Sequence, residues 1–288
     1  MCIITESKLR NLIKEALSEV LLEHDNYYTQ YSDIVNELSH YRKYFYNKVV
    51  MLCCDKPYIS KFWNYFSNNM GKLNIPMVVS TFWSNNDEMP AKMTILTNNG
   101  IKDVKLKGNG DFLSDEVKQI MGYVDIVVTN PPFGNGMFSK FLQSLKQLNK
   151  KFIVIGPTQS GYDGKVFNMI KNGEVSIGYN SNMKFTDQRD GGRKKGINSV
   201  WYTNMKRPNK GEFKSKIVGN QFTKYDNMDA INVNSINNIP TNYDGNIGVP
   251  PSVIRDIDLN LYQLLGTYTN LMINGQKVPK RIIIRKKR

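Results

Sequence analysis

The stretch from Tyr123 to Gly136 reads YVDIVVTNPPFGNG, and its character changes halfway along. The first half is apolar and largely β-branched, which is typical of a strand buried in a sheet. The pattern stops at Asn130, and the two prolines that follow have no backbone N–H to offer a neighbouring strand. The stretch therefore predicts a core strand that runs directly into a rigid Asn-Pro-Pro-Phe loop.

Strand and helix patterns alternate on both sides of this stretch, from about residue 48 to residue 180. The segments expected to be strands or hairpins are apolar and rich in β-branched residues: 48–55, 75–83, 91–110 and 150–157. The segments expected to be helices have apolar residues at helical spacing: 59–69, 111–121, 137–148 and 165–173. This alternation predicts an α/β fold with a doubly wound, mostly parallel sheet, which binds ligands beyond the carboxyl ends of its strands.

The pattern divides the chain into three regions. Residues 1–24 are predicted to form an N-terminal amphipathic helix extension, because their apolar residues recur at helical spacing among mixed charges. Residues 25–180 form the α/β domain, which opens with a helix from Asp33 onward, capped by Ser32. Residues 181–288 form a loop-rich C-terminal region packed on that core, and its closing residues predict an edge strand.

The chain is strongly basic, since its 288 residues include 39 Lys and Arg against 25 Asp and Glu, for a net charge of +14. Two basic clusters stand out, RDGGRKK at 189–195 and KRIIIRKKR at 280–288. The excess favours a polyanionic partner, most simply nucleic acid, and the alternative is that the charge serves solubility alone. No apolar run reaches the ~20 residues that a membrane span needs, so no membrane contact is expected.

Cysteines and histidines are few. The cysteines are Cys2, Cys53 and Cys54, and the histidines are His24 and His40. Neither set has the spacing of metal ligands, so no metal site is expected. The lack of a disulfide framework favours a reducing cytoplasm.

The Asn-Pro-Pro-Phe loop offers two hydrogen-bond acceptors and an aromatic plane in fixed positions. The side-chain oxygen of Asn130 and the carbonyl of Pro131 form a fork, Pro132 stiffens it, and Phe133 supplies a stacking surface. Such a fork fits an exocyclic amine on an aromatic base, such as N6 of adenine. Holding both amine hydrogens out of the ring plane frees the nitrogen lone pair for attack, so positioning and electrostatics carry the step. The alternative is an ordinary turn between strand and helix.

Residues near other strand ends suit a donor that contains adenosine. Asp111, in GNGDF, is placed to accept a hydrogen bond from an adenine amine, with Phe112 against the ring; the alternative for Asp111 is a helix cap. Asp55 follows the first strand of the α/β pattern, and Tyr28 with Thr29 could hold a carboxylate. Together these residues favour S-adenosylmethionine.

With these motifs in this order, the sequence resembles the adenine-specific DNA methyltransferases of the EcoRI modification-enzyme family. The resemblance covers about residues 25–284. It is carried by TNPPF, KKFIVIGP and VWYTNM, and by the more family-specific blocks KYDNMDAINVN, IPTNYDGNIGVP and INGQKVPKRIIIRK. The sequence departs from the family in two places: no counterpart of residues 1–24 is recognised, and the stretch 180–198 is expected to be shorter than its equivalent, which leaves the exact DNA sequence open. The usual glycine-rich loop of methyltransferases is replaced by LCCDKP.

The resemblance implies a methyltransferase sheet, S-adenosylmethionine as cofactor without a metal, and N6 of adenine in double-stranded DNA as the acceptor, with GAATTC as a candidate target. It implies that Asn130, Pro131, Pro132 and Phe133 form the catalytic loop. It also implies a set of cofactor contacts: Tyr28, Thr29, Cys54, Asp55, Asp111, Phe112 and Asn130.

An adenine inside a duplex has to be flipped out to reach such a pocket. Phe133 is expected to stack on one face of the base and Trp201 or Tyr202 on the other, the alternative for these two being a place in the core. The target-reading segment is expected at 179–199, which is loop-like and basic. The side chains expected to contact DNA there are Arg189, Arg193, Lys194 and Lys195. The alternative is a free surface loop.

Two other functions stay open at this point. One is an N-methyltransferase acting on RNA or on a protein amide, which the missing glycine-rich loop and the C-terminal blocks disfavour. The other is a non-catalytic DNA-binding decoy with the same fold, which the intact Asn-Pro-Pro-Phe motif disfavours. The expected setting is a monomer in the cytoplasm of a bacterial cell or phage-infected host, with a restriction endonuclease of the same site as a candidate partner.

Overall fold

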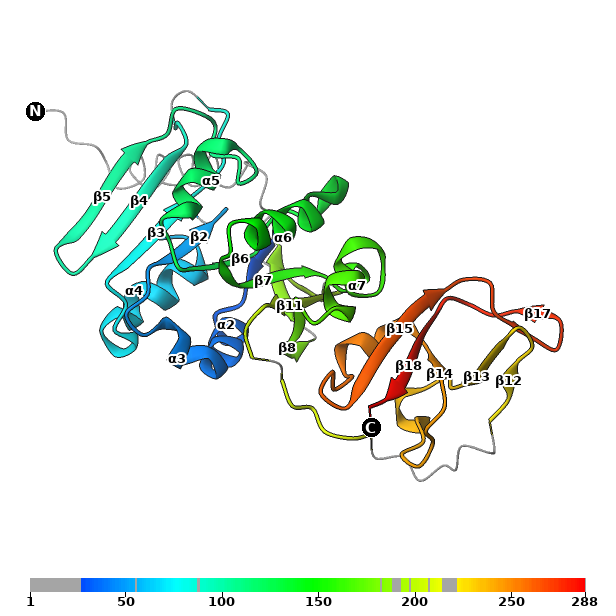
Figure 1. Ribbon diagram of the computed structural model, residues 1–288. Helices are drawn as coiled ribbons and strands as arrows, with labels where there is room; N and C mark the ends of the chain where they lie inside the picture. Colours follow the sequence, from blue (N-terminus) through cyan, green and yellow to red (C-terminus); the bar gives the residue numbers. More distant parts are fainter. Residues whose placement is uncertain are drawn as a thin grey trace, which may run out of the picture.

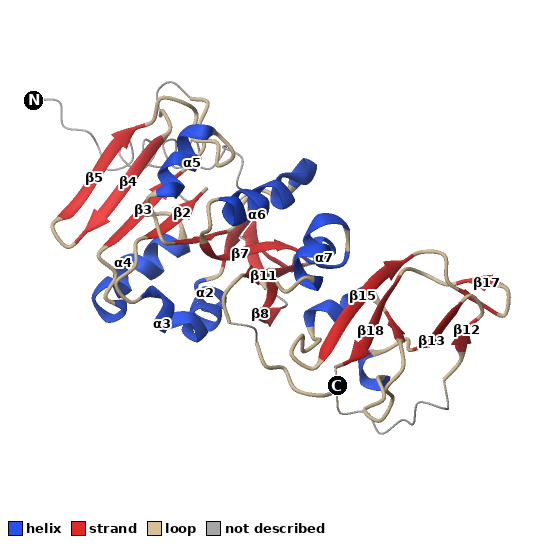
Figure 2. Ribbon diagram, in the orientation of Figure 1, coloured by secondary structure: helices blue, strands red, loops and turns tan. Residues whose placement is uncertain are grey.

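The computed structural model describes residues 27–54, 56–86, 89–181, 183–187, 193–196, 198–206, 208–213 and 222–287. The predicted helix at 1–24 lies outside these residues. Two lobes are visible: a larger one with helices around a long sheet, and a C-terminal one built mainly of strands (Figures 1 and 2).

The larger lobe contains an eight-stranded sheet in the order β5-β4-β3-β2-β6-β7-β11-β8. The strands are β2 (Val50–Cys53), β3 (Met77–Thr81), β4 (Lys92–Thr97), β5 (Gly100–Lys105), β6 (Ile126–Thr129), β7 (Lys151–Pro157), β8 (Ser176–Ser181) and β11 (Ser199–Thr203). β2 pairs in parallel with β3 and β6, and β6 with β7. Within this sheet β4 and β11 run against the other strands. The predicted α/β fold with a large, mostly parallel sheet is confirmed.

Helices cover both faces of this sheet. They are α2 (Tyr31–Leu38), α3 (Arg42–Phe45), α4 (Lys61–Leu73), α5 (Asp115–Gly122), α6 (Met137–Gln147) and α7 (Gly164–Lys171), with 3₁₀ turns η1 (Ser39–Tyr41), η2 (Gly134–Gly136) and η3 (Thr158–Tyr162). Val50 and Leu52 pack into the core under α2, α3 and α4, whereas Met51 and Cys53 pack into the core under α5, α6 and α7. Alternate residues of β2 are therefore buried on opposite faces, as a parallel strand requires. None of the described helices is long and apolar enough to cross a membrane.

Helix α2 begins earlier than predicted. Its N-cap is Gln30 rather than Ser32, because Gln30 has the extended backbone of a cap and its carbonyl accepts the first bonds, from the N–H groups of Asp33 and Ile34. The inward face of this helical segment is apolar and fully buried, as its members show: Ile34, Leu38, Tyr41 and Phe45.

A small sheet joins two distant parts of the chain. β1 (Tyr27–Thr29) and β10 (Arg193–Gly196) both pair antiparallel with β9 (Lys184–Asp187). We call β9 and β10 the β9–β10 hairpin; its connection, 188–192, lies outside the described residues. The segment predicted to hold the cofactor thus lies beside the segment predicted to read DNA.

The larger sheet continues beyond residue 180, where the sequence places a region boundary. β11 lies between β7 and β8 and pairs antiparallel with both. All five of its residues are buried, which explains why this strand belongs with the core rather than with the C-terminal region.

The C-terminal lobe is a five-stranded sheet where the sequence predicts mainly loops. Its order is β12-β13-β14-β18-β15, with bounds β12 (Lys224–Tyr225), β13 (Met228–Asn232), β14 (Ile247–Val249), β15 (Tyr262–Tyr268) and β18 (Arg281–Lys286). Smaller elements are η6 (Ile236–Asn238), η7 (Pro251–Arg255) and the hairpin of β16 (Met272–Ile273) and β17 (Gln276–Lys277).

The closing strand β18 is not the predicted edge strand. It pairs with both β14 and β15, and Ile282, Ile283 and Ile284 are buried. Consecutive apolar residues are buried on both faces only when a strand lies inside a sheet, so the isoleucine run outweighs the basic residues around it. The C-terminal lobe contacts the larger lobe at the end of η3. There the ammonium group of Lys280 forms an ion pair with the carboxylate of Asp163 at 2.8 Å.

Candidate active site

The Asn-Pro-Pro-Phe loop lies at the carboxyl edge of the parallel strands. It leaves β6, which is flanked by β2 and β7, and leads through η2 into α6. The hydroxyl of Thr129 donates to the carbonyl of Cys53, which ties the last residues of β6 and β2 together. Asn130 and Phe133 are half-buried. The loop therefore starts from a rigid point in the middle of the sheet, as the sequence predicts.

The position of Phe133 depends on close packing behind it. Its ring meets the edge of Phe138, in the first turn of α6, at 6.1 Å between centroids. Phe138 in turn lies so close to Gly156 of β7 that a Cβ on that glycine would come within 2.1 Å of the ring. Only glycine at residue 156 leaves room for Phe138, so this contact fixes the start of α6 and with it the loop.

The segment that carries Asp111 is anchored against the end of β3. The N–H of Ser84 donates to the carbonyl of Asn109 at 2.9 Å. Gly110 has a φ of +75°, and a Cβ there would lie 2.2 Å from the carbonyl oxygen of Phe82. Asp111 follows directly, half-buried, and its Oδ1 accepts the N–H of Leu113 at 2.8 Å. One carboxylate oxygen is thus used in the local turn that orients the side chain.

Phe112, which is predicted to contact a ligand ring, is buried against helix α6. Phe112 is 5% exposed, and its ring packs against Phe141 of α6 at 5.0 Å in an edge-to-face arrangement. Its main role in this structure is to hold the Asp111 segment on α6.

The other predicted cofactor residues flank the same edge. Cys54 follows β2 with a φ of +65°, so the chain turns sharply there. Asp55 lies outside the described residues. Tyr28 and Thr29 belong to β1, just before α2, and the chain then runs through α3 back to the amino end of β2.

The fit of a polar cofactor depends on the polar groups near the strand ends, and three hydroxyl groups there are buried. The Oγ1 atoms of Thr29, Thr81 and Thr158 are buried and have no hydrogen-bond partner among the described residues. Thr29 closes β1, Thr81 closes β3, and Thr158 directly follows β7. These oxygens are enclosed by protein, so they do not themselves face a ligand. The half-buried carboxylate of Asp111, with one oxygen left over by the turn, is an acceptor that fits the adenine amine of S-adenosylmethionine.

The predicted stacking of Trp201 or Tyr202 on a base is wrong for this structure. Both residues are 0% exposed. Trp201 packs edge-to-face on Phe62 at 6.0 Å, and the hydroxyl of Tyr202 donates to the carbonyl of Pro157 at 2.7 Å. Both rings are enclosed because β11 is an interior strand, covered on both faces. The alternative place in the core is the one that the structure shows.

The predicted DNA contacts fall on or beside the β9–β10 hairpin. The backbone of Arg193, Lys194 and Lys195 forms β10, opposite β9, and Arg189 lies outside the described residues. Their role as target readers stays a prediction. The structure adds that β1 is the third strand of this sheet, with Tyr28 opposite Thr186.

Glu37 is a candidate functional residue that the sequence reasoning missed. It lies on the inward face of α2, between Ile34 and Tyr41, and is 0% exposed. An acidic residue at an apolar-face position of an amphipathic helix is a signal that could have singled it out.

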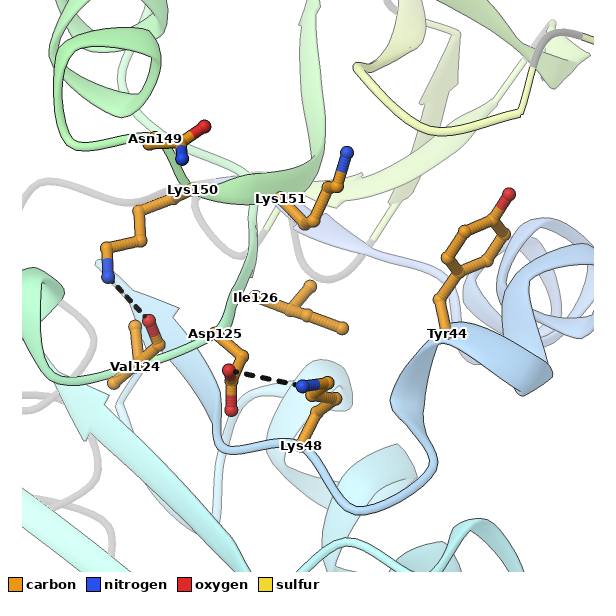
Figure 3. Close-up of a pocket in the computed structure, with 8 residues that line it drawn as sticks. All are labelled: Tyr44, Lys48, Val124, Asp125, Ile126, Asn149, Lys150 and Lys151. Carbon is orange, nitrogen blue, oxygen red and sulfur yellow. Dashed lines mark hydrogen bonds and ion pairs between the residues drawn. The ribbon is translucent and has the colours of Figure 1, made fainter.

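A cavity of about 320 Å³ lies at the opposite edge of the sheet (Figure 3). Its lining residues are Tyr44, Lys48, Val124, Asp125, Ile126, Asn149, Lys150 and Lys151. Lys48 pairs with Asp125 at 3.6 Å, and Lys150 donates to the carbonyls of Gly122 and Val124 at 2.7 and 2.8 Å. These lysines hold the amino ends of β2, β6 and β7 together. The cavity therefore lies at the edge of the sheet away from the Asn-Pro-Pro-Phe loop, and its charged side chains have a structural role.

Metal-ligating groups do not gather anywhere in the described part of the chain, where no cluster of three or more His, Cys, Asp and Glu side chains could hold an ion.

Comparison with known proteins places the chain in a family. The family described as "Adenine-specific methyltransferase EcoRI" matches residues 21–288. The chain is 32% identical to the type II methyltransferase M.EcoRI of Escherichia coli, over 92% of this chain and 94% of that protein. It is 31% identical to the type II methyltransferase M.MgeORF184P of Mycoplasma genitalium and 28% identical to M.MpnI of Mycoplasma pneumoniae, each over 86% of this chain and 84% of the relative. No solved structure matches significantly.

The family match covers both lobes, including the loop at Asn130 and the C-terminal strands. The two most similar relatives named above are both type II methyltransferases, and the match covers 94% and 84% of their lengths. The chain therefore belongs to the EcoRI family of adenine-specific methyltransferases, and it is a site-specific DNA methyltransferase.

Proposed function

We propose that this protein transfers a methyl group from S-adenosylmethionine to N6 of an adenine that has been flipped out of duplex DNA, with GAATTC as the candidate target. The observation that carries the proposal is the position of Asn130 to Phe133, at the carboxyl end of β6, among the parallel strands in the middle of the sheet. Ligands of such sheets bind at this edge.

The residues expected to hold the cofactor come from neighbouring loops. Asp111 is oriented by the Leu113 N–H, which leaves its second oxygen as an acceptor for the adenine amine of the cofactor. Thr29 and Tyr28 would hold the carboxylate, and Asp55, which follows Cys54 in the sequence, would hold the ribose hydroxyls. When bound, S-adenosylmethionine supplies a methyl group on a positively charged sulfur.

The chain's own contribution to the transfer is to position the target amine. The Asn130 side-chain oxygen and the Pro131 carbonyl accept both N6 hydrogens and hold them out of the ring plane. The N6 lone pair, freed in this way, would take up the methyl group that the bound cofactor supplies, and the nitrogen would afterwards release a proton to water. No ionisable side chain is needed as a base before the transfer.

The target base has to leave the duplex before it can meet the fork, at a cost of a few kcal/mol for unstacking and unpairing. Phe133 is half-buried, so part of its ring remains available to stack on the base. The net charge of +14 supports binding to the phosphate backbone. The hairpin carrying Arg193 supports reading of the major groove, where arginine is the commonest specific contact. A restriction endonuclease of the same site is the proposed functional partner.

The test is methyl transfer from labelled S-adenosylmethionine to a set of defined substrates. These are a GAATTC duplex, duplexes with single-base changes, the same duplex with N6 of the target adenines already methylated, single-stranded RNA, and a glutamine peptide. We expect label in the unmodified duplex alone, at N6 of adenine. Label in RNA or peptide, or DNA binding without transfer, would replace the proposal by the corresponding alternative. Transfer to a different duplex site would correct only the target sequence.

A further inference from the structure

Helix α2 and its cap carry a row of polar side chains that hold the chain leading into the β9–β10 hairpin. The row consists of Gln30, Asp33 and Glu37, which lie at spacings of three and four residues and so share one face. Their partners are, in the same order, the hydroxyl of Thr186, the N–H of Lys184 at 3.1 Å, and the N–H groups of Tyr179 and Asn180 at 2.9 and 2.8 Å. The row therefore runs antiparallel along residues 179–186.

Glu37 is the most deeply buried member of the row, with 0% exposure. Its Oε1 also accepts the Tyr41 hydroxyl at 3.1 Å, and its Oε2 also accepts the Asn180 side-chain amide at 2.9 Å. Burial raises the pKa of the Glu37 carboxyl above its ordinary value, while the hydrogen bonds from Tyr179, Asn180 and Tyr41 act in the opposite direction. Helix packing alone would be served at least as well by an apolar side chain, so an acid here needs another explanation.

The surroundings of Glu37 leave little room for adjustment. A Cβ on Gly178 would lie 2.2 Å from Glu37 Oε1 and 2.6 Å from Cβ of Trp201, so β8 approaches the carboxylate closely. The Tyr179 ring stacks on His40 with 3.9 Å between centroids and 9° between planes. Two successive backbone N–H groups and one stacked ring thus fix the direction in which the chain leaves β8.

We propose that Glu37 is a positioning residue for DNA recognition: it fixes the end of β8 and thereby the placement of the β9–β10 hairpin against β1. This inference rests on the proposed function, in which the hairpin reads the target and β1 contacts the cofactor. Direct readout requires side chains to meet base edges with hydrogen-bond geometry. A hairpin released at its root would lose that geometry while phosphate contacts, which tolerate displacement, would persist.

The test is the substitution Glu37→Gln. It keeps the shape of the side chain but replaces one of the two acceptor oxygens by an NH₂ group, which can only donate hydrogen bonds. The ratio of kcat/KM for the preferred duplex to kcat/KM for single-base variants should fall by about tenfold, the size of one lost base contact. Non-specific binding to unrelated duplexes should change by less than about twofold, because phosphate contacts dominate it.

Asp258→Asn is the matched control. Asp258 is also 0% exposed, and its Oδ2 accepts two successive backbone N–H groups, of Lys210 and Gly211, at 2.7 and 2.8 Å. Its partners belong to the segment that leads to the C-terminal lobe rather than to the hairpin. This variant should lower the melting temperature as Glu37→Gln does and keep wild-type discrimination.

A milder variant guards against loss of folding. Asp33→Ala removes only the exposed bond to the Lys184 N–H, and should reduce discrimination in the same direction by a smaller factor. Wild-type discrimination in Glu37→Gln, or in Asp33→Ala if Glu37→Gln does not fold, would overturn the inference. An equal loss of discrimination in Asp258→Asn would also overturn it. If the wild-type protein methylated no duplex, the proposed function itself would fail, which is a separate outcome.

Discussion

Asn130 is the residue on which the proposed chemistry depends most directly. Asn130→Ala removes one of the two acceptors for the target amine and leaves β6 and the prolines in place. Because the lost contact acts mainly in the transition state, single-turnover methylation should slow by about 10²–10³-fold, while cofactor affinity stays near that of the wild type. Rapid-quench methylation and calorimetry measure the two quantities. Asn168→Ala, at an exposed position of α7, is the control. A wild-type rate in Asn130→Ala would remove this loop from the mechanism.

Asp111 separates cofactor binding from local structure. In Asp111→Asn the amide oxygen can still accept the Leu113 N–H, so the turn should hold, but the group left for the cofactor amine is now a donor. S-adenosylmethionine affinity should fall by the ~1.5–3 kcal/mol of one hydrogen bond to a charged group, with little change in melting temperature. Titration calorimetry measures the affinity. Asp115→Asn, whose side chain is 97% exposed, should bind like the wild type. Unchanged affinity in Asp111→Asn would reduce this aspartate to a turn residue.

At the scale of elements, the sequence predicted what depends on local pattern and missed what depends on distant pairing. β2, β6 and β7 follow from short apolar runs, and α4 and α6 from helical periodicity, because both signals are complete within about ten residues. The pairing of β1 with β9 and the interior place of β18 are set by segments far apart in the chain, which no local pattern encodes. Trp201 shows the same limit, because an aromatic residue on a strand looks alike whether it faces a ligand or a core.

The Asn109–Asp111 turn gives a test at this scale. Gly110→Ala places a methyl group 2.2 Å from the Phe82 carbonyl oxygen at a φ of +75°. It should lower the free energy of unfolding by more than about 1 kcal/mol and weaken cofactor binding, since Asp111 moves with the turn. Gly122→Ala, in helix α5 with nothing within 4 Å of the added Cβ, should raise stability by about 0.5–1 kcal/mol and leave binding unchanged. Denaturant titration and calorimetry distinguish the two. A destabilised Gly110→Ala with full cofactor affinity would show that this turn does not hold the cofactor.

At the scale of the whole molecule, two lobes meet along the end of η3 and the C-terminal strands. The Tyr162 carbonyl accepts the Thr267 hydroxyl at 3.0 Å, and Lys171 donates to the Leu265 carbonyl at 2.7 Å. Apolar residues of both lobes, among them Val166 and Ile284, share one core cluster. These contacts hold the C-terminal lobe against the larger lobe, and this lobe is a second candidate for reading bases.

The net charge of +14 predicts that DNA binding weakens as the salt concentration rises. Log affinity should fall linearly with log salt concentration, with a slope of about 0.9 per phosphate neutralised.

Lys194→Ala should weaken binding to all duplexes and reduce the slope by about one, as expected for a phosphate contact. Arg193→Ala, and Arg189→Ala likewise, should relax discrimination at one base position by ~1–3 kcal/mol with little change for non-specific DNA. Methylation rates on single-base variants at two salt concentrations separate these effects, and Lys72→Ala, at the exposed end of α4, is the control. If the hairpin variants all keep wild-type discrimination, the bases are read by the C-terminal lobe, and the segment from Lys224 to Pro250 is where substitutions should then relax it.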